Sequence, residues 1–193
     1  MGMEFELKYR ADAAALSRIR EALAGPAQLY EMQTTYYDTL DGSFSSRKWT
    51  LRRRMENGRS VCTLKTPATG HGRQEWEVDC GNIEAAIPML CKLGCPEALR
   101  FLAAQGLQPI CGARFTRTAK TLSHAGAVLE VAMDSGILYG GGREMPLCEL
   151  EVELKSGPEE VCVAFAQALA RQYGLTPEPL SKFRRALDLY KGV

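Results

Sequence analysis

The segment EFELKYR, residues 4–10, alternates charged and apolar side chains. Residues two apart share one face of a β-strand. As a strand, this segment has Glu4, Glu6 and Lys8 on one face and an apolar second face that requires burial. Two carboxylates and an ammonium group within about 14 Å of one another could bind a metal ion or an anion, or could simply face water.

Acidic side chains alternate in the same way further along the chain. Glu149, Glu151 and Glu153 share one face of a segment near the C-terminus, and Glu75 and Glu77 share one face of a middle segment. Carboxylates held so close together repel and raise one another's pKa, and a bound cation relieves that repulsion. Oxygen ligands without a histidine cluster favour Mg²⁺ or Mn²⁺ over Zn²⁺.

Basic side chains gather on other strands. Arg52 and Arg54 share one face of a predicted strand, and Lys65 lies on the strand that follows the Asn57-Gly58 hairpin signal. The planar fork of arginine matches phosphate oxygens. Together, the acidic and basic strands indicate a polyanion bound with a metal ion inside a barrel with a wet interior. The alternative is an ordinary sheet whose charged faces point outward.

The whole composition is that of one globular domain, residues 1–193, with 46% apolar and 24% charged residues. The net charge of +1 gives no reason to expect a nucleic-acid or membrane partner. No apolar run approaches the roughly 18 residues of a membrane span, and the first ten residues do not look like a signal peptide. We therefore expect a cytoplasmic protein. The sequence does not predict its oligomeric state.

The seven cysteines are odd in number and include no C-x-x-C pair. Cys91 and Cys95 could share a helix face, but no second pair lies near them at the spacing of a zinc site. We expect reduced thiols packed as small apolar groups.

Hydrophobic periodicity and turn signals divide the chain into strands with long helical excursions, which predicts an α+β fold with a mainly antiparallel sheet. Helices are expected at residues 12–24, at 83–105 in two pieces, at 159–173 and after a Ser181 cap. Strands are expected at residues 4–10, 33–39, 48–55, 60–67, 74–80, 109–124, 127–136 and 148–157.

The chain resembles the CYTH superfamily, the triphosphate tunnel metalloenzymes. The resemblance begins with the E-x-E-x-K motif from Glu4 to Lys8. TYYDT, LRRR, TLK, RQEWEV, a basic strand around Arg117, LEVAMDSG, ELEVEL and SKFRR then follow in the family's order. The short first motif is weak by itself, but the ordered series covers nearly the whole chain. It implies an eight-stranded antiparallel β-barrel, a tunnel with a charged interior flanked by helices.

The resemblance also implies the roles of individual residues. Lys8 and Tyr36 are the expected catalytic residues, and Arg184 is an additional phosphate-binding candidate. The metal ligands are expected among Glu4, Glu6, Glu77, Glu130, Asp134, Glu149, Glu151 and Glu153, and the phosphate-binding residues are Lys8, Arg52, Arg54, Lys65, Arg117, Lys182 and Arg185. Arg53 alternates with its neighbours and should point away from the tunnel.

The implied activity is Mg²⁺- or Mn²⁺-dependent hydrolysis of a triphosphate, and the motifs look closest to the bacterial inorganic triphosphatase branch. The alternatives are a thiamine triphosphatase, an adenylate cyclase of the same fold, and a non-catalytic polyphosphate- or nucleotide-binding module. Trp49 and Trp76 are expected on the apolar backs of their strands, and His71 and His124 in solvent. The branch often carries a helical, histidine-rich C-terminal domain, which we do not expect in a chain ending at Val193.

Overall fold

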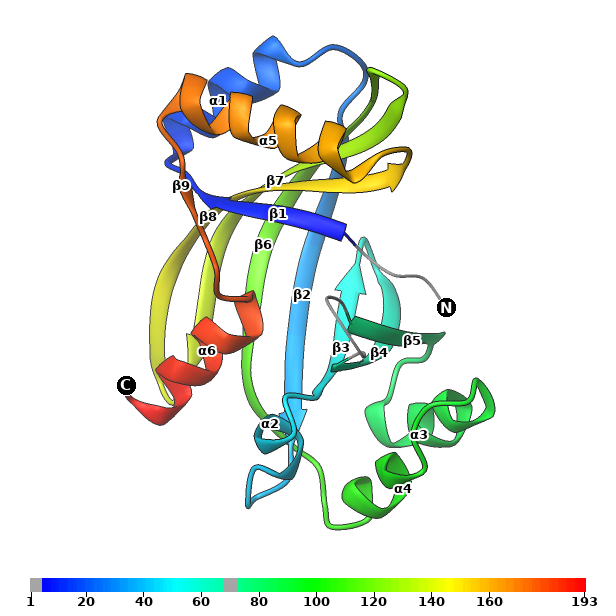
Figure 1. Ribbon diagram of the computed structural model, residues 1–193. Coiled ribbons are helices and arrows are strands. Elements are labelled where there is room, and N and C mark those ends of the chain that lie inside the picture. The colour runs from blue at the N-terminus through cyan, green and yellow to red at the C-terminus, as the bar shows by residue number, and fades with distance from the viewer. Residues whose placement is uncertain (1–4, 68–72) are drawn as a thin grey trace.

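The computed structural model describes residues 5–67 and 73–193, which form nine strands and six helices (Figure 1). The helices are α1 (Ala13–Ala22), α2 (Ser43–Ser46), α3 (Ile83–Lys92), α4 (Ala98–Ala103), α5 (Glu159–Tyr173) and α6 (Lys182–Lys191). The strands are β1 (Phe5–Arg10), β2 (Gln28–Asp38), β3 (Thr50–Glu56), β4 (Arg59–Pro67), β5 (Arg73–Asp79), β6 (Gln108–His124), β7 (Ala127–Gly140), β8 (Arg143–Ser156) and β9 (Thr176–Pro177).

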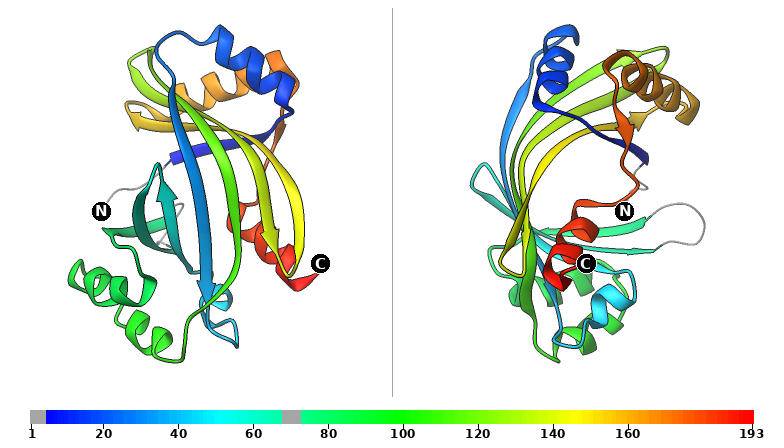
Figure 2. Two further views of the ribbon diagram at one scale, coloured as in Figure 1. Left: turned by 180° about the vertical axis from the view of Figure 1, so that it is seen from behind. Right: turned by 90° about the vertical axis from the view of Figure 1, so that its left-hand side faces the viewer.

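The strands form a single antiparallel sheet in the order β5-β4-β3-β2-β6-β7-β8-β1-β9. The pairing of β1 with β8 brings the first strand of the chain beside the last long one. The sheet curves strongly around a concave face, as the right-hand view of Figure 2 shows. Within the described residues no ladder joins β5 to β1, so the curved sheet is open on that side.

Alternation along the strands gives the sheet two chemically different faces. On the convex face, Leu129, Val131, Leu150 and Val152 pack beneath α1 and α5. A second apolar cluster lies under α3 and α4, where Leu51, Leu64 and Trp76 are buried with residues of both helices. The burial of these apolar surfaces stabilises the strands and turns their charged side chains toward the concave face.

Helix α6 packs on the concave face against β6 and β7. Its N-cap is Ser181, whose Oγ accepts a hydrogen bond from the Arg184 N–H. Ala186 and Leu187 of the helix are buried with Phe115 and Tyr36. Because α6 lies inside the curve, it brings Lys182 to charged residues of the sheet.

The predicted α+β tunnel fold is confirmed, with four differences of detail. A ninth strand of two residues, β9, pairs with β1, and the described part of the sheet is not closed into a barrel. The strands at 33–39 and 127–136 extend further than predicted, and α2 follows the Asp41-Gly42 turn without having been expected. Residues Asn57 and Gly58 both have positive φ, 48° and 87°, as the predicted hairpin requires.

No helix in the described ranges has both the length and the apolar character needed to cross a bilayer.

Candidate active site

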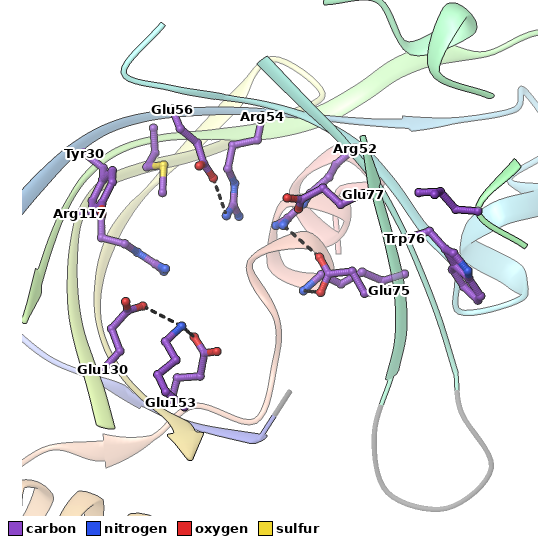
Figure 3. Close-up of a pocket in the computed structure, with 14 residues that line it drawn as sticks. Tyr30, Arg52, Arg54, Glu56, Glu75, Trp76, Glu77, Arg117, Glu130 and Glu153 are labelled. Carbon is purple, nitrogen blue, oxygen red and sulfur yellow. Dashed lines mark ion pairs between the residues drawn. The ribbon is translucent and has the colours of Figure 1, made fainter. Parts of the chain in front are cut away.

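Two adjoining cavities occupy the concave face. The first has a volume of about 750 Å³ (Figure 3), and the second, beside α6, has a volume of about 710 Å³. Both are lined by the same four basic residues, Arg52, Arg54, Lys65 and Arg117. The cavities therefore form one continuous space, and four of the predicted phosphate-binding side chains lie at its centre.

The charges that line this space are distributed unevenly. Around the first cavity, five basic side chains face five acidic ones among the described residues. Around the second, nine basic side chains face only Glu6 and Glu151. The additional cations of the second cavity are Lys8, Lys48, Arg73, Lys182 and Arg184. The second cavity is therefore the part of the site with the strongest attraction for an anion.

The central arginines, Arg52 and Arg54, have hydrogen-bond donors that are unpaired or weakly paired. Arg52 Nε and Thr50 Oγ1 are buried without a hydrogen-bond partner in the described structure. Burial lowers the pKa of Arg54 to about 10, and repulsion from Arg52 contributes to the shift. Arg54 Nε donates to Thr34 Oγ1 at 3.1 Å, and its nearest carboxylate, Glu56, is 3.7 Å away. Clustered cations and buried unpaired donors of this kind favour the binding of an anion.

Lys65 and the two glutamates of β5 form a separate group. Lys65 Nζ lies 3.1 Å from Glu75, and an Arg52 nitrogen lies 3.7 Å from the same carboxylate. Glu77 accepts a hydrogen bond from Thr63 at 3.3 Å. Figure 3 shows Glu77 beside Arg52 and across the cavity from Glu130. The structure therefore does not bring Glu77 together with the other predicted metal ligands.

Glu6, Glu153 and Glu130 form a row across three neighbouring strands. The register pairs Glu6 of β1 with Glu153 of β8, and Glu153 with Glu130 of β7. Lys155 Nζ lies 2.8 Å from Glu153 and 3.4 Å from Glu130. Carboxylates directly opposite one another repel, so this acidic row is suited to a divalent cation. Glu4, another predicted metal ligand, lies outside the described residues.

The other predicted acidic ligands form a buried cluster with basic partners. Carboxylate oxygens of Asp134, Glu149 and Glu151 lie within 4.8 Å of one another. Lys182 Nζ contacts all three, at 2.8 Å from Asp134 and 2.7 Å from Glu151. Arg117 makes two hydrogen bonds to Asp134, at 2.8 and 2.7 Å, and a third to Glu151. Lys182, predicted to bind phosphate, here neutralises carboxylates.

The two glutamates of this cluster differ in their affinity for a proton. Burial raises the pKa of Glu149 to about 7, against the opposing attraction of Lys182. Burial also acts to raise the pKa of Glu151, but Lys182 and Arg117 overcome it and hold that pKa well below its usual range. The Lys182 pKa is raised because the three carboxylates outweigh the effect of burial. The cluster is therefore an internal ion network, and its carboxylates are already neutralised by basic groups.

Lys8 and Tyr36, the predicted catalytic residues, both line the second cavity. Lys8 Nζ lies 3.7 Å from Glu6. Tyr36 is only 3% exposed, and its ring packs against Phe183 with a centroid distance of 4.9 Å. Both side chains are therefore placed to reach a molecule bound beside α6.

Arg185 lies away from both cavities, in contrast to Arg184, which lines the second. One Arg185 nitrogen donates to Glu149, and another lies 3.4 Å from Glu178. Glu178 also accepts from Arg10 Nε at 2.5 Å and from the Leu180 N–H at 2.9 Å. Sequence reasoning missed Glu178, because this residue follows a two-residue strand and belongs to no periodic pattern.

The CYTH domain family model matches residues 2–187 of the chain. The chain belongs to the CYTH domain family. The family resemblance predicted from the motifs is thus confirmed.

This CYTH domain is 32% identical over 155 residues to the inorganic triphosphatase of Haemophilus influenzae. The alignment covers 78% of the present chain and 44% of that relative, so the chain spans less than half the length of the curated relative it matches.

Solved structures share the fold at lower sequence identity. HpAC1 from Hippeastrum, studied as an adenylyl cyclase and described as having a dominant triphosphatase activity, superposes with a TM-score of 0.67 at 21% identity. That match covers 98% of this chain and 96% of HpAC1. The PH1819 protein of Pyrococcus horikoshii gives a TM-score of 0.63 at 20% identity, with 96% and 98% covered.

Proposed function

We propose that this CYTH domain hydrolyses a triphosphate in the presence of Mg²⁺ or Mn²⁺, and that inorganic triphosphate is the preferred substrate. The observation that carries the proposal is the group of Arg52, Arg54, Lys65 and Arg117 at the junction of the two cavities. These side chains come from three strands, so a linear polyanion can contact all of them only inside the curve of the sheet. The Haemophilus relative, an inorganic triphosphatase, supports this choice of substrate.

The charge distribution supports one orientation of the bound triphosphate. The phosphates would extend from the four central cations into the second cavity, where basic side chains greatly outnumber acidic ones. Glu130 and Glu153, which line the first cavity, would then lie at the other end of the phosphate chain, and Glu6 would lie beside the chain in the second cavity. Trp76 lines the first cavity but is only 7% exposed within an apolar cluster, and Tyr36 is packed on Phe183, so neither ring offers a free face for stacking on a nucleobase.

The residues present fit a hard divalent cation. Glu6, Glu130 and Glu153 offer only oxygen donors, and they form a row of like charges that a cation would relieve. We assign the metal to this row, with Glu4 as a further ligand. Asp134, Glu149 and Glu151 are the weaker choice, because buried Lys182 contacts all three and Arg117 contacts two of them. The row is also partly neutralised, but its cation Lys155 is 39% exposed and free to move aside for a metal ion. When bound, Mg²⁺ or Mn²⁺ would offset phosphate charge and make a coordinated water more acidic.

The side chains of this chain would act on the triphosphate mainly by electrostatics and positioning. In phosphoryl transfer, negative charge spreads over the oxygens of the transferred group, and fixed cations stabilise it there. Arg52 and Arg54 have unpaired or weakly paired donors for this task. Lys8 would stabilise the leaving phosphate oxygen or orient the attacking water, and Tyr36 would hold the substrate beside it.

A phosphate-release assay tests the proposal. Inorganic triphosphate, thiamine triphosphate and ATP are each supplied with Mg²⁺ or Mn²⁺, and cyclic AMP is measured in parallel. We expect the fastest release from inorganic triphosphate and none in excess chelator. Release of cyclic AMP from ATP would identify a cyclase, and binding of all three without turnover would identify a binding module.

A pair of glutamate variants tests the assignment of the metal. Glu6→Gln should lose nearly all metal-dependent turnover, because one charged ligand of the acidic row is removed. Glu144→Gln is the matched control, since exposed Glu144 pairs with Arg114 and lines neither cavity. Equal activity of the two variants would show that the acidic row does not bind the catalytic metal.

A further inference from the structure

Two thiols lie next to each other at the C-terminal end of α3. Cys95 Sγ is 3.8 Å from Cys91 Sγ, close enough for the first thiol to donate a hydrogen bond to the second. Cys91 belongs to the last turn of α3, and Cys95 follows Gly94, whose φ of +81° turns the chain back. A disulfide requires a sulfur–sulfur distance of about 2.05 Å, which small side-chain rotations can provide from this separation.

The two thiols differ in environment. Cys91 is half-buried and lies beside Arg100, whose pKa is raised by its interaction with Cys91. Cys95 is buried, and burial together with its hydrogen bond to Cys91 raises the pKa of Cys95 to about 12. This difference suits a pair in which the more exposed thiol attacks the oxidant first. The buried thiol then attacks the resulting mixed disulfide.

We propose that Cys91 and Cys95 form a reversible disulfide on reaction with low-molecular-weight disulfides. The Cys91 thiolate attacks a sulfur of the reagent; a mixed disulfide forms, and one reagent thiol leaves. The Cys95 thiolate then attacks the Cys91 sulfur, which forms the Cys91–Cys95 bond and releases the second reagent thiol. The two protons lost by Cys91 and Cys95 end on the two released reagent thiols, and the two electrons lost by the protein reduce the reagent disulfide.

The location gives this modification a structural consequence. The closed ring would enclose Leu93, an exposed residue that, like Trp76, lines the first cavity. Oxidation would therefore fix the turn that forms part of the cavity wall. The proposed disulfide does not depend on the function proposed for the phosphate site.

Cys62 and Cys80 form a second neighbouring pair, with Cys62 Sγ 3.3 Å from the Cys80 carbonyl oxygen. Cys62 is fully buried between the strands and α3, and burial raises its pKa to about 11. A solvent oxidant has no access to its sulfur, so this pair is expected to stay reduced and serves as an internal comparison.

Peptide mapping of the folded protein under non-reducing conditions tests the proposal. The reduced chain is incubated with glutathione disulfide, its remaining thiols are blocked with N-ethylmaleimide, and it is digested with trypsin. Cleavage after Lys92 separates Cys91 and Cys95 into peptides 74–92 and 93–100. We expect these two peptides to be recovered as a disulfide-linked species that dithiothreitol separates.

Two variants identify the bond, because peptide 74–92 also contains Cys80. Cys80→Ser should retain the linked species, and Cys91→Ser should abolish it. The proposal is overturned if the wild-type peptides carry only separate glutathione adducts or remain unmodified. It is equally overturned if the link persists in Cys91→Ser.

Discussion

Arg52 and Arg53 are neighbours on β3 that face opposite sides of the sheet. Arg52 lines both cavities, whereas Arg53 donates to the Gly81 carbonyl oxygen at 2.9 Å on the convex side. Comparing variants of these two residues therefore separates the effect of a charge inside the tunnel from the effect of a charge on the outer face of the same strand.

Arg52→Ala should lower kcat/KM for inorganic triphosphate by about 10- to 100-fold, the value of one or two charge-assisted hydrogen bonds. Arg53→Ala should change it by no more than about twofold, as expected for a residue outside the site. Steady-state kinetics on both purified variants checks this. Similar losses in the two would show that the strand, and not the charge inside the tunnel, is responsible.

Glu178 links three elements through a buried carboxylate. Its side chain contacts Arg10 and Arg185, and its N–H donates to the Lys8 carbonyl oxygen at 2.8 Å. Burial acts to raise the pKa of Glu178, but the hydrogen bonds from Arg10 and the Leu180 N–H, together with the charge of Arg185, outweigh burial and lower the pKa from its ordinary value. A carboxyl group with a lowered native pKa stabilises the fold above its unfolded pKa and loses that contribution as the pH falls.

Glu178→Gln should therefore lower the free energy of unfolding near neutral pH by about 1.5–3 kcal/mol, the value of a hydrogen bond to a charged group. The difference from the wild type should shrink below pH 4.5, where the wild-type carboxyl group takes up its proton. Urea unfolding at a series of pH values measures both effects. A difference that is constant with pH would show that the Glu178 charge does not stabilise the fold.

At the scale of elements, the backbone of β6 leaves no room for a side chain at Gly136 of β7. A Cβ at this position would lie 2.2 Å from the Arg114 carbonyl oxygen and 2.5 Å from Phe115 Cα, both backbone atoms. This glycine ends the LEVAMDSG motif, one of those that resemble the CYTH family. Its place is thus explained by packing between strands, two residues from Asp134.

Gly136→Ala should destabilise the domain by about 1–3 kcal/mol, because neither backbone atom can move without disturbing the ladder. Gly81→Ala is the control, since a Cβ there meets nothing within 4 Å and its φ is not positive. That control should change stability by no more than about 0.5 kcal/mol. Equal unfolding midpoints for the two variants would contradict the close approach.

Apolar packing and buried ion pairs together fix the position of helix α6. Its apolar residues Ala186 and Leu187 pack on β6 and β7, and its basic residues Lys182 and Arg185 pair with buried carboxylates of β7 and β8. Removal of one partner from such a buried pair leaves an uncompensated charge. The ion network thus fixes α6 on the concave face, where Arg184 can line the second cavity.

At the scale of the whole molecule, the curved sheet brings cations from distant segments into one space. Repulsion among them opposes folding, and a bound polyanion would remove that repulsion. Binding to the native state alone raises the unfolding free energy by about 2.7 kcal/mol at 100 times the dissociation constant.

Inorganic triphosphate at that excess, with chelator present to prevent turnover, should therefore raise Tm by about 5–10 °C for a domain of this size. The shift should diminish as ionic strength increases, because salt screens the attraction. Differential scanning fluorimetry measures it, with sulfate at matched ionic strength as the control. An equal shift with sulfate would show that the cavities have no preference for a chain of phosphates.

The sequence by itself determined which side chains face the concave side. A strand has a two-residue period, so Glu6 and Lys8, or Arg52 and Arg54, share a face wherever the strand is placed. The same local rule correctly placed Arg53 and Trp76 on the opposite face. The capping of α6 by Ser181 and the turn at Asn57-Gly58 are likewise local, and both were predicted from a few adjacent residues.

Only the tertiary structure decided how the charges pair. Lys182 meets Glu149 across 33 residues of sequence, and Arg10 meets Glu178 across 168. No periodicity within a segment encodes such contacts, because they depend on the order of the strands and on the placement of α6 inside the curve. For that reason the acids predicted as one set of metal ligands separated into two groups. One is a row across three strands, next to Lys155 and Lys8, and the other is a buried network around Lys182 and Arg117.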